Sequence, residues 1–331
     1  MKLSFRTLIR VSVMALTFAM TTFAQKAPAP TAPQGEIDAA KKIEVAKDFS
    51  GKMKAAEDFM KKNSKSVLRP QVAQILAEEI YRGNDPKARL SQYDAYSKIF
   101  NNDEEIGYIL PGKVDALIST GNIDEAFKLA PKALEKQPDQ AFLLAQLAIA
   151  GRNALQQNKP DYAVVSKGYA AKAIALIEAD KMPEKTDPKS WELLKKQQLP
   201  ELYFSQGLIL YSEQDAAGAK ASFEKAVTLN PANPNNYFML SALADADYQK
   251  AAMDYNVASN AEKPAKLKAA EAAMDVIIDY SAHALALVEG KPESKAMYDQ
   301  LLGETQNIYK LRHKASSADG LKAIIEKYKV K

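Results

Sequence analysis

The chain has 331 residues, with 45 basic and 41 acidic side chains, 13 Gly, 16 Pro and no Cys. Few helix-breaking residues beside abundant alanine, leucine, lysine and glutamate favour helices, since strands would show alternating valine, isoleucine and threonine between turn residues. The lack of cysteine excludes a disulfide framework, thiol catalysis and a lipid attached through an N-terminal cysteine. We therefore expect an all-α chain.

Residues 1–24 have the order of a secretory signal peptide. A basic start is followed by an apolar segment, and Thr22 and Ala24 are the small residues that a signal peptidase reads. An uncleaved anchor is the weaker alternative, because the apolar run after Arg10 is shorter than the ~20 residues of a spanning helix. We expect a periplasmic or secreted protein without a membrane span after cleavage.

Removal of this signal leaves 42 basic and 41 acidic residues, because the signal holds three basic residues and no acidic one. A mature chain that is nearly neutral gives no support for a general nucleic-acid partner or for binding to an anionic membrane.

The predicted elements after the signal begin with a Pro- and Ala-rich flexible leader over residues 25–35. Residues 36–63 predict an N-terminal capping helix, with a break near Gly51. A free coiled coil that binds a partner is the alternative, which the lack of a strict heptad disfavours. Residues 66–83 and 87–101 predict the next helix pair.

Two later stretches, residues 107–138 and 200–231, share a pattern of small and aromatic residues. In the second stretch Gly207 allows two helices to approach closely, and Tyr203 and Phe223 fill the seam between them. The matching positions keep a constant offset of 93 residues: Ala126, Ala133 and Pro138 correspond to Ala219, Ala226 and Pro231.

This pattern resembles the tetratricopeptide repeat of exported bacterial proteins, whose signature of small and aromatic residues spans about 34 residues. The resemblance implies a right-handed superhelical solenoid of antiparallel helix hairpins over residues 36–331, with five to six hairpins. The clearest repeats fall in the following ranges: 107–140, 141–183 with an insertion, 200–233 and 234–290.

The spacing between repeats is irregular at one point, where 59 residues separate Ala141 from Pro200. This is about 25 more than one repeat uses. The extra length contains a helix over residues 161–180 and a loop that ends before Trp191. A functional loop and a tolerated surface insertion are both open.

The C-terminal part predicts two further helix pairs. Residues 235–258 and 263–289 form an oversized hairpin with Ala-rich faces, and residues 293–315 and 318–328 form a terminal pair.

Candidate catalytic and cofactor residues are few. His283 and His313 lie on different predicted helices, and the carboxylates lie among lysines, as on solvated helix faces, so we expect no metal and no cofactor. The segment GYILPGK matches the start of a phosphate-binding loop, but Val114 stands where Ser or Thr must hold magnesium. Glu293 is the candidate acid of an alternative function, a cell-wall polymer hydrolase on a helical scaffold.

The resemblance also implies a concave groove lined by the first helices of successive repeats, where a peptide or helix from a partner protein binds. Lys and Asn of the subclass that clamps an acidic C terminus are replaced by Phe204 and Leu208, so we expect apolar anchors instead. Since Tyr203 and Phe223 fill the seam, Phe204 and Tyr211 are expected to face away from it. The alternative is that adjacent helices cover these aromatics. The predicted groove residues are Tyr108, Ile118, Phe142, Ile149, Arg152, Phe204, Leu208, Tyr211, Asn235 and Phe238.

These observations together indicate a non-enzymatic scaffold or adaptor of the cell envelope.

Overall fold

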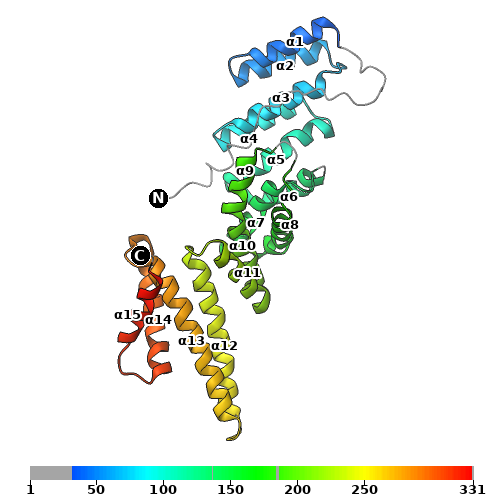
Figure 1. Cartoon of the computed structure of the whole chain (residues 1–331). Helices are drawn as coiled ribbons and strands as arrows, with labels where there is room; N and C mark the ends of the chain where they lie inside the picture. Colours follow the sequence, from blue (N-terminus) through cyan, green and yellow to red (C-terminus); the bar gives the residue numbers. More distant parts are fainter. Residues whose placement is uncertain (1–31, 136, 184–185, 330–331) are drawn as a thin grey trace. The chain divides into compact units, whose positions relative to one another are not determined.

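The structure is a computed structural model that describes residues 32–135, 137–183 and 186–329 (Figure 1). Over these residues the regular elements are helices, and most consecutive pairs pack as antiparallel hairpins. The predicted all-α solenoid of helix hairpins is confirmed. The expected signal peptide and most of the expected leader lie outside the described residues.

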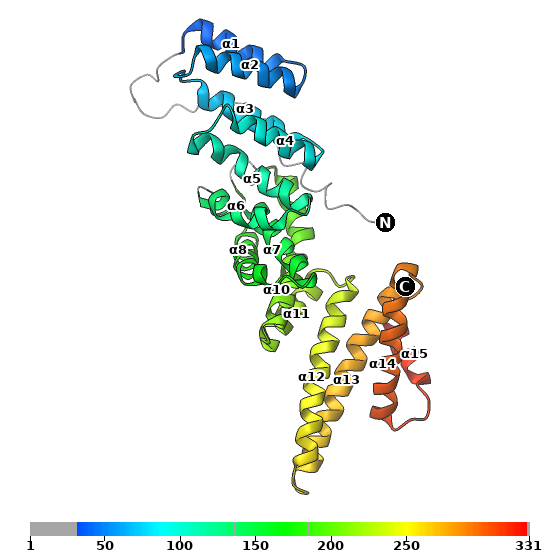
Figure 2. The same ribbon diagram turned by 180° about the vertical axis from the view of Figure 1, so that it is seen from behind.

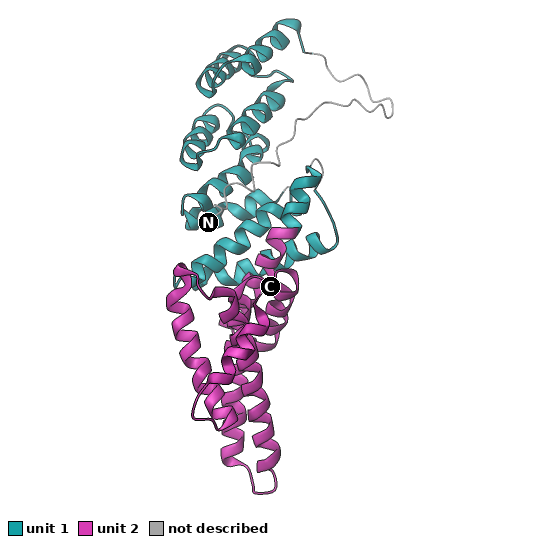
Figure 3. Ribbon diagram, turned by 60° about the vertical axis from the view of Figure 1, so that its left-hand side comes forward, with its two compact units in different colours: residues 1–195 teal, residues 196–331 magenta. Residues whose placement is uncertain are grey.

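Contacts within the chain divide it into two compact units, Met1–Lys195 and Lys196–Lys331 (Figure 3). The boundary falls within a short π-helix, η4 (Leu194–Gln198), which leads into α10 (Leu199–Ser212). A single repeat domain over residues 36–331 remains a prediction.

Unit 1 contains four hairpins and a short additional helix. The first helices of its hairpins pack on one another, α3 against α5 and α5 against α7. The elements are α1 (Gln34–Val45), α2 (Phe49–Lys62), α3 (Arg69–Arg82), α4 (Pro86–Ser97), α5 (Asp103–Ser119), α6 (Ile123–Glu135), α7 (Ala141–Gln156), η3 (Pro160–Tyr162), α8 (Ala163–Glu178) and α9 (Pro188–Leu193).

The capping segment expected over residues 36–63, with its break, forms a hairpin of two helices, α1 and α2. The helix breaks before Asp48 rather than at Gly51, because the Asp48 carboxylate accepts a hydrogen bond of 2.7 Å from the Gly51 amide and caps α2. Six hairpins therefore form over the part of the chain that the structure describes, within the predicted five to six, and α14 and α15 each pack on α13.

Unit 2 begins with α10 and contains the two longest helices of the described chain. These helices, α12 and α13, pack along each other, as Figure 2 shows. Their bounds lie within two residues of the predicted hairpin. The remaining elements of unit 2 are α11 (Ala216–Leu229), α12 (Pro234–Val257), α13 (Lys263–Val288), η5 (Pro292–Ser294), α14 (Lys295–His313) and α15 (Asp319–Tyr328).

The seam between α10 and α11 is packed around one buried ring. Phe223 is fully buried, and a Cβ atom added to Gly207 would lie 2.6 Å from Phe223 Cε1. The small residue at 207 is thus what allows the ring to lie against α10.

Phe204 also belongs to this seam, contrary to the expectation that it faces away. Its side chain is only 8% exposed, and its ring centroid lies 5.7 Å from that of Phe223. Residues three apart share a helix face, so Phe204 lies beside Gly207, the residue on which Phe223 is seated. Tyr211 is 43% exposed, as expected.

Candidate partner-binding site

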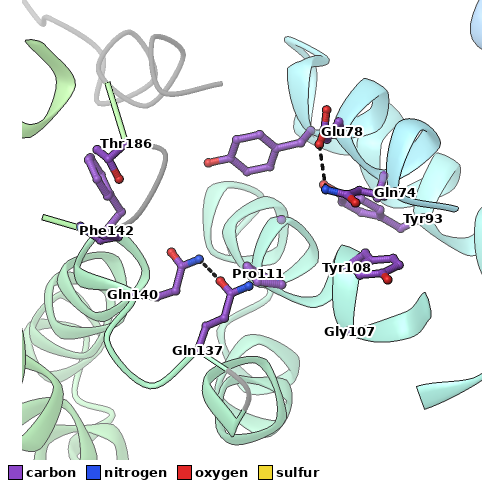
Figure 4. A pocket seen from close by; sticks show the side chains of 14 residues that line it. Gln74, Glu78, Tyr93, Gly107, Tyr108, Pro111, Gln137, Gln140, Phe142 and Thr186 are labelled. Carbon is purple, nitrogen blue, oxygen red and sulfur yellow. Dashed lines mark hydrogen bonds between the residues drawn. The ribbon is translucent and has the colours of Figure 1, made fainter. Parts of the chain in front are cut away.

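A hollow of about 330 Å³ lies in unit 1, where α3, α5 and the start of α7 meet (Figure 4). Two of the predicted groove residues, Tyr108 of α5 and Phe142 of α7, line it, and both side chains are partly buried. Gln74 and Glu78 of α3 lie on one side of the hollow, and Gln140 lies on the opposite side (Figure 4). The surface therefore combines aromatic rings, amides and one carboxylate.

Two unusual residues in α5 shape the floor of this hollow. A Cβ atom at Gly112 would lie 2.9 Å from Cδ2 of Tyr81 and would collide with the hydroxyl of Tyr93. The glycine thus allows both tyrosines to pack on α5. Pro111 has no N–H, so the carbonyl of Gly107 lacks the helical donor four residues later. Both Gly107 and Pro111 line the hollow.

A buried polar network lies beneath the floor and joins α4, α5 and α7. Arg89, which is 7% exposed, places Nη1 2.7 Å from Oδ2 of Asp115 and donates from Nη2 to the Gly112 carbonyl at 2.8 Å. Asp115, which is 5% exposed, accepts a second hydrogen bond of 2.6 Å from Nε2 of Gln146. The guanidinium carbon of Arg89 also lies 5.1 Å from the ring centroid of Tyr81.

The placement of these charges contradicts the interpretation of helical carboxylates as solvated faces. Asp115 is buried, and so is Glu105, which accepts a hydrogen bond of 2.9 Å from Nη2 of Arg69. This hydrogen bond raises the pKa of Arg69. The local sequence signal for this buried pair was Asp115, an acidic residue within an apolar run. The partner of Asp115, Arg89, lies 26 residues away in sequence.

A second hollow, of about 640 Å³, borders Tyr108 on the side of α6. Its lining includes Asp103, Glu104, Lys132 and Glu135, and Lys132 is paired with Asp103 at 3.1 Å. The Tyr108 hydroxyl donates to Oε1 of Glu104 at 2.8 Å. Burial and this hydrogen bond raise the pKa of Tyr108 to about 12, so its ring remains neutral. Three carboxylates, Asp103, Glu104 and Glu135, line this hollow with one lysine, Lys132. The surroundings of Tyr108 are therefore acidic.

The insertion before α10 contributes to one side of the first hollow. Trp191 of α9 is buried, and its ring centroid lies 6.4 Å from that of Phe142 in an edge-on arrangement. The indole Nε1 donates to Oδ1 of Asp180 at 2.7 Å, and this hydrogen bond lowers the pKa of Asp180. Through α9 the insertion thus packs against Phe142. The sequence had left open whether the insertion is a functional loop or a tolerated surface insertion.

The other predicted groove residues are distributed over both units. Arg152 lies on α7, about 15 Å along the helix from Phe142, and hydrogen-bonds to Asn153. Leu208, Tyr211 and Phe238 belong to unit 2 together with Phe204, and Leu208 and Phe238 are partly buried. The structure therefore brings Tyr108 and Phe142 together in one hollow.

The histidines and Glu293, which were considered for chemistry, lie outside this site. His283 stacks between Tyr237 and Tyr328, with ring centroids 3.8 Å and 4.2 Å away, as a packed helix residue. Glu293 is exposed on η5, and the GYILPGK segment lies inside α5 rather than in a loop. Within the described residues, no group of three or more His, Asp or Glu side chains could hold a metal ion.

None of the helices in the described ranges is long and apolar enough to cross a membrane.

No protein-family model and no curated protein sequence matches this chain. Among solved structures, it is similar to a tetratricopeptide repeat protein from Parabacteroides merdae ATCC 43184. The two share 11% sequence identity with a TM-score of 0.36, and the match covers 81% of this chain and 98% of the other.

Proposed function

We propose that this chain is a non-enzymatic scaffold of the cell envelope, exported through residues 1–24, that holds a peptide or helix of a partner protein. The observation that carries this proposal is the hollow lined by Tyr108, Phe142 and a set of glutamine side chains. Aromatic rings supply the contact area on which protein recognition mainly depends, and amides can donate to and accept from the main chain of a peptide.

The support beneath the hollow favours this function as well. Arg89, Asp115 and Gln146 connect three helices by hydrogen bonds, and Gly112 seats two tyrosines closely on α5. A binding surface that is already ordered loses less conformational entropy when the partner binds. In unit 2, Leu208, Tyr211 and Phe238 are the proposed additional contacts, whereas Phe204 supports the seam.

The alternative, a cell-wall polymer hydrolase, depends on Glu293. A general acid of this kind needs surroundings that keep it protonated, such as an apolar pocket. Glu293 is exposed on the short helix η5, so no observation favours this carboxylate as a catalyst.

Site-directed crosslinking tests the proposed surface, because the sequence has no cysteine that would compete for a thiol-reactive label. Gln137→Cys places a photo-crosslinker at the edge of the hollow. Lys128→Cys places the same label on an exposed position of α6 as the matched control. We expect a distinct envelope protein to be crosslinked from position 137 and not from position 128.

The crosslinked protein is then purified, and its affinity is measured by calorimetry for the wild-type chain, Tyr108→Ala and Phe142→Ala. Loss of an aromatic anchor should cost about 2 kcal/mol, which weakens binding by about 30-fold. Equal crosslinking from both positions, or unchanged affinity of both folded variants, would show that the partner binds elsewhere.

A further inference from the structure

We propose that the hollow between α3, α5 and α7 anchors one basic side chain, a lysine or an arginine, of the partner peptide. This inference rests on the proposed function and specifies the chemistry of the residue that is bound. It differs from the expectation of purely apolar anchors, and it follows from the acceptors, the charge and the rings that meet at this place.

The hollow offers hydrogen-bond acceptors that suit a cation. The Glu78 carboxylate lines it and already accepts from Nε2 of Gln74 at 3.2 Å, which orients the carboxylate (Figure 4). Its ionic neighbour is Arg82, whose Nη2 lies 3.8 Å from Oε2 of Glu78, near the limit for an ion pair. The Gly107 carbonyl is a second acceptor, since Pro111 supplies no amide hydrogen to it. An ammonium or guanidinium group can donate to either acceptor.

The charge around the hollow is negative, which is the sign that attracts a basic side chain. The residues that line the hollow include Glu78 and neither lysine nor arginine. The adjoining hollow adds Glu104 and Glu135, while Lys132 is neutralised by Asp103. A concave surface with excess negative charge attracts cationic groups and repels anionic ones. An acidic peptide or a terminal carboxylate would find no cation in this lining.

The aromatic rings of the hollow also attract a cation. Tyr108 and Phe142 line the hollow, and ring faces attract a cation within about 6 Å of their centroid. Tyr81 and Tyr93 also line it, but the guanidinium carbon of Arg89 lies 5.1 Å from the Tyr81 centroid and 5.9 Å from the Tyr93 centroid. That charge is balanced by Asp115 at 2.7 Å. Tyr108 and Phe142 are therefore the rings assigned to the incoming side chain.

The size of the hollow limits what enters it. Pockets for drug-sized ligands span about 300–1,000 Å³, and a volume of about 330 Å³ lies at the lower end of this range. One long side chain and its adjoining main chain fit this space, whose lining includes the amides of Gln74, Gln137 and Gln140.

Selection of random dodecapeptides displayed on phage against the full mature chain tests the anchor. We expect the selected peptides to share one lysine or arginine position, and substitution of that position by norleucine to weaken binding about tenfold. Glu78→Gln should weaken the same peptides about tenfold, because it keeps the shape and removes the charge. Glu79→Gln is the matched control, since Glu79 pairs with Lys52 at 3.0 Å and does not line the hollow; it should leave affinity within about twofold.

Three other results have distinct meanings. Peptides that lose affinity in Tyr108→Ala and Phe142→Ala, but share no basic residue and bind Glu78→Gln normally, would overturn the basic anchor and leave the scaffold function standing. Peptides that need a basic residue but ignore Glu78→Gln would also overturn the anchor at this hollow. If no peptide is selected, or if binding is unaffected by all of these variants, both proposals fail.

Discussion

Replacement of Gly207 by alanine tests the packing of the α10–α11 seam at a single atom. The added Cβ would lie 2.6, 2.8 and 2.9 Å from three ring carbons of Phe223. Favourable carbon contacts occur at about 3.5–4.0 Å, so the ring or the helix must shift by roughly 1 Å. Phe223 is fully buried and has no solvent side to move toward.

Two opposing effects determine the size of the change. Alanine is favoured over glycine inside a helix by about 1 kcal/mol, whereas overpacking of a core costs about 1–3 kcal/mol. For a rigid ring in contact at 2.6 Å we take the upper part of that range. Gly207→Ala should then destabilise the hairpin by about 1–2 kcal/mol. In a Phe223→Ala background the ring is gone, and the same substitution should stabilise the hairpin by about 1 kcal/mol.

Native-state hydrogen exchange of the α10 and α11 amides is the suitable assay, because a repeat array need not unfold in one step. We expect exchange to accelerate about 5- to 30-fold in Gly207→Ala and to slow about 5-fold when the substitution is made in Phe223→Ala. An equal change in both backgrounds would refute the contact with Phe223 as the cause. Slower exchange in the wild-type background would show that the seam has room for a methyl group.

Three further predictions concern other parts of the chain. Arg89→Met should lower the free energy of unfolding by about 3–5 kcal/mol in urea titrations, because it leaves Asp115 buried without a counter-charge; a loss below about 1 kcal/mol would contradict this. Burial lowers the pKa of His283, so its contribution to stability is complete above about pH 6.5 and is lost as pH falls through the lowered pKa. His283→Gln should therefore reduce the loss of melting temperature between pH 8 and pH 5, and an unchanged pH profile would exclude this role. N-terminal sequencing of the exported protein should begin at Gln25, and a chain that retains residues 1–24 would refute signal cleavage.

The helices could be predicted closely because their signals are local. The hairpin expected at residues 235–258 and 263–289 is observed as Pro234–Val257 and Lys263–Val288. Proline in the first turn marks where each of these helices begins. A periodicity of 3.6 residues then defines the buried face of each helix.

The candidate site was only partly accessible to such reasoning. Tyr108 and Phe142 follow from their positions in the repeat, and the structure places both in one hollow. The buried pair of Arg89 and Asp115 could not be predicted, because a charged residue on a helix is usually solvated and its partner lies in another hairpin. The exposure expected for Phe204 was wrong, because its ring packs 5.7 Å from that of Phe223 within the seam.

Two departures from a regular repeat meet at this hollow, and both have a structural cost. A proline in a helix interior removes a hydrogen bond and costs about 3 kcal/mol, yet Pro111 stands inside α5, next to Gly112. The insertion that delivers α9 adds a loop whose closure opposes folding, yet it ends with Trp191 packed against Phe142. The first departure leaves an acceptor at Gly107, and the second positions a ring on the opposite side of the hollow. Sequence features that oppose stability and converge on one surface are typical of a functional site, and this convergence favours the hollow over the α10–α11 seam, where Gly207 and Phe223 serve packing.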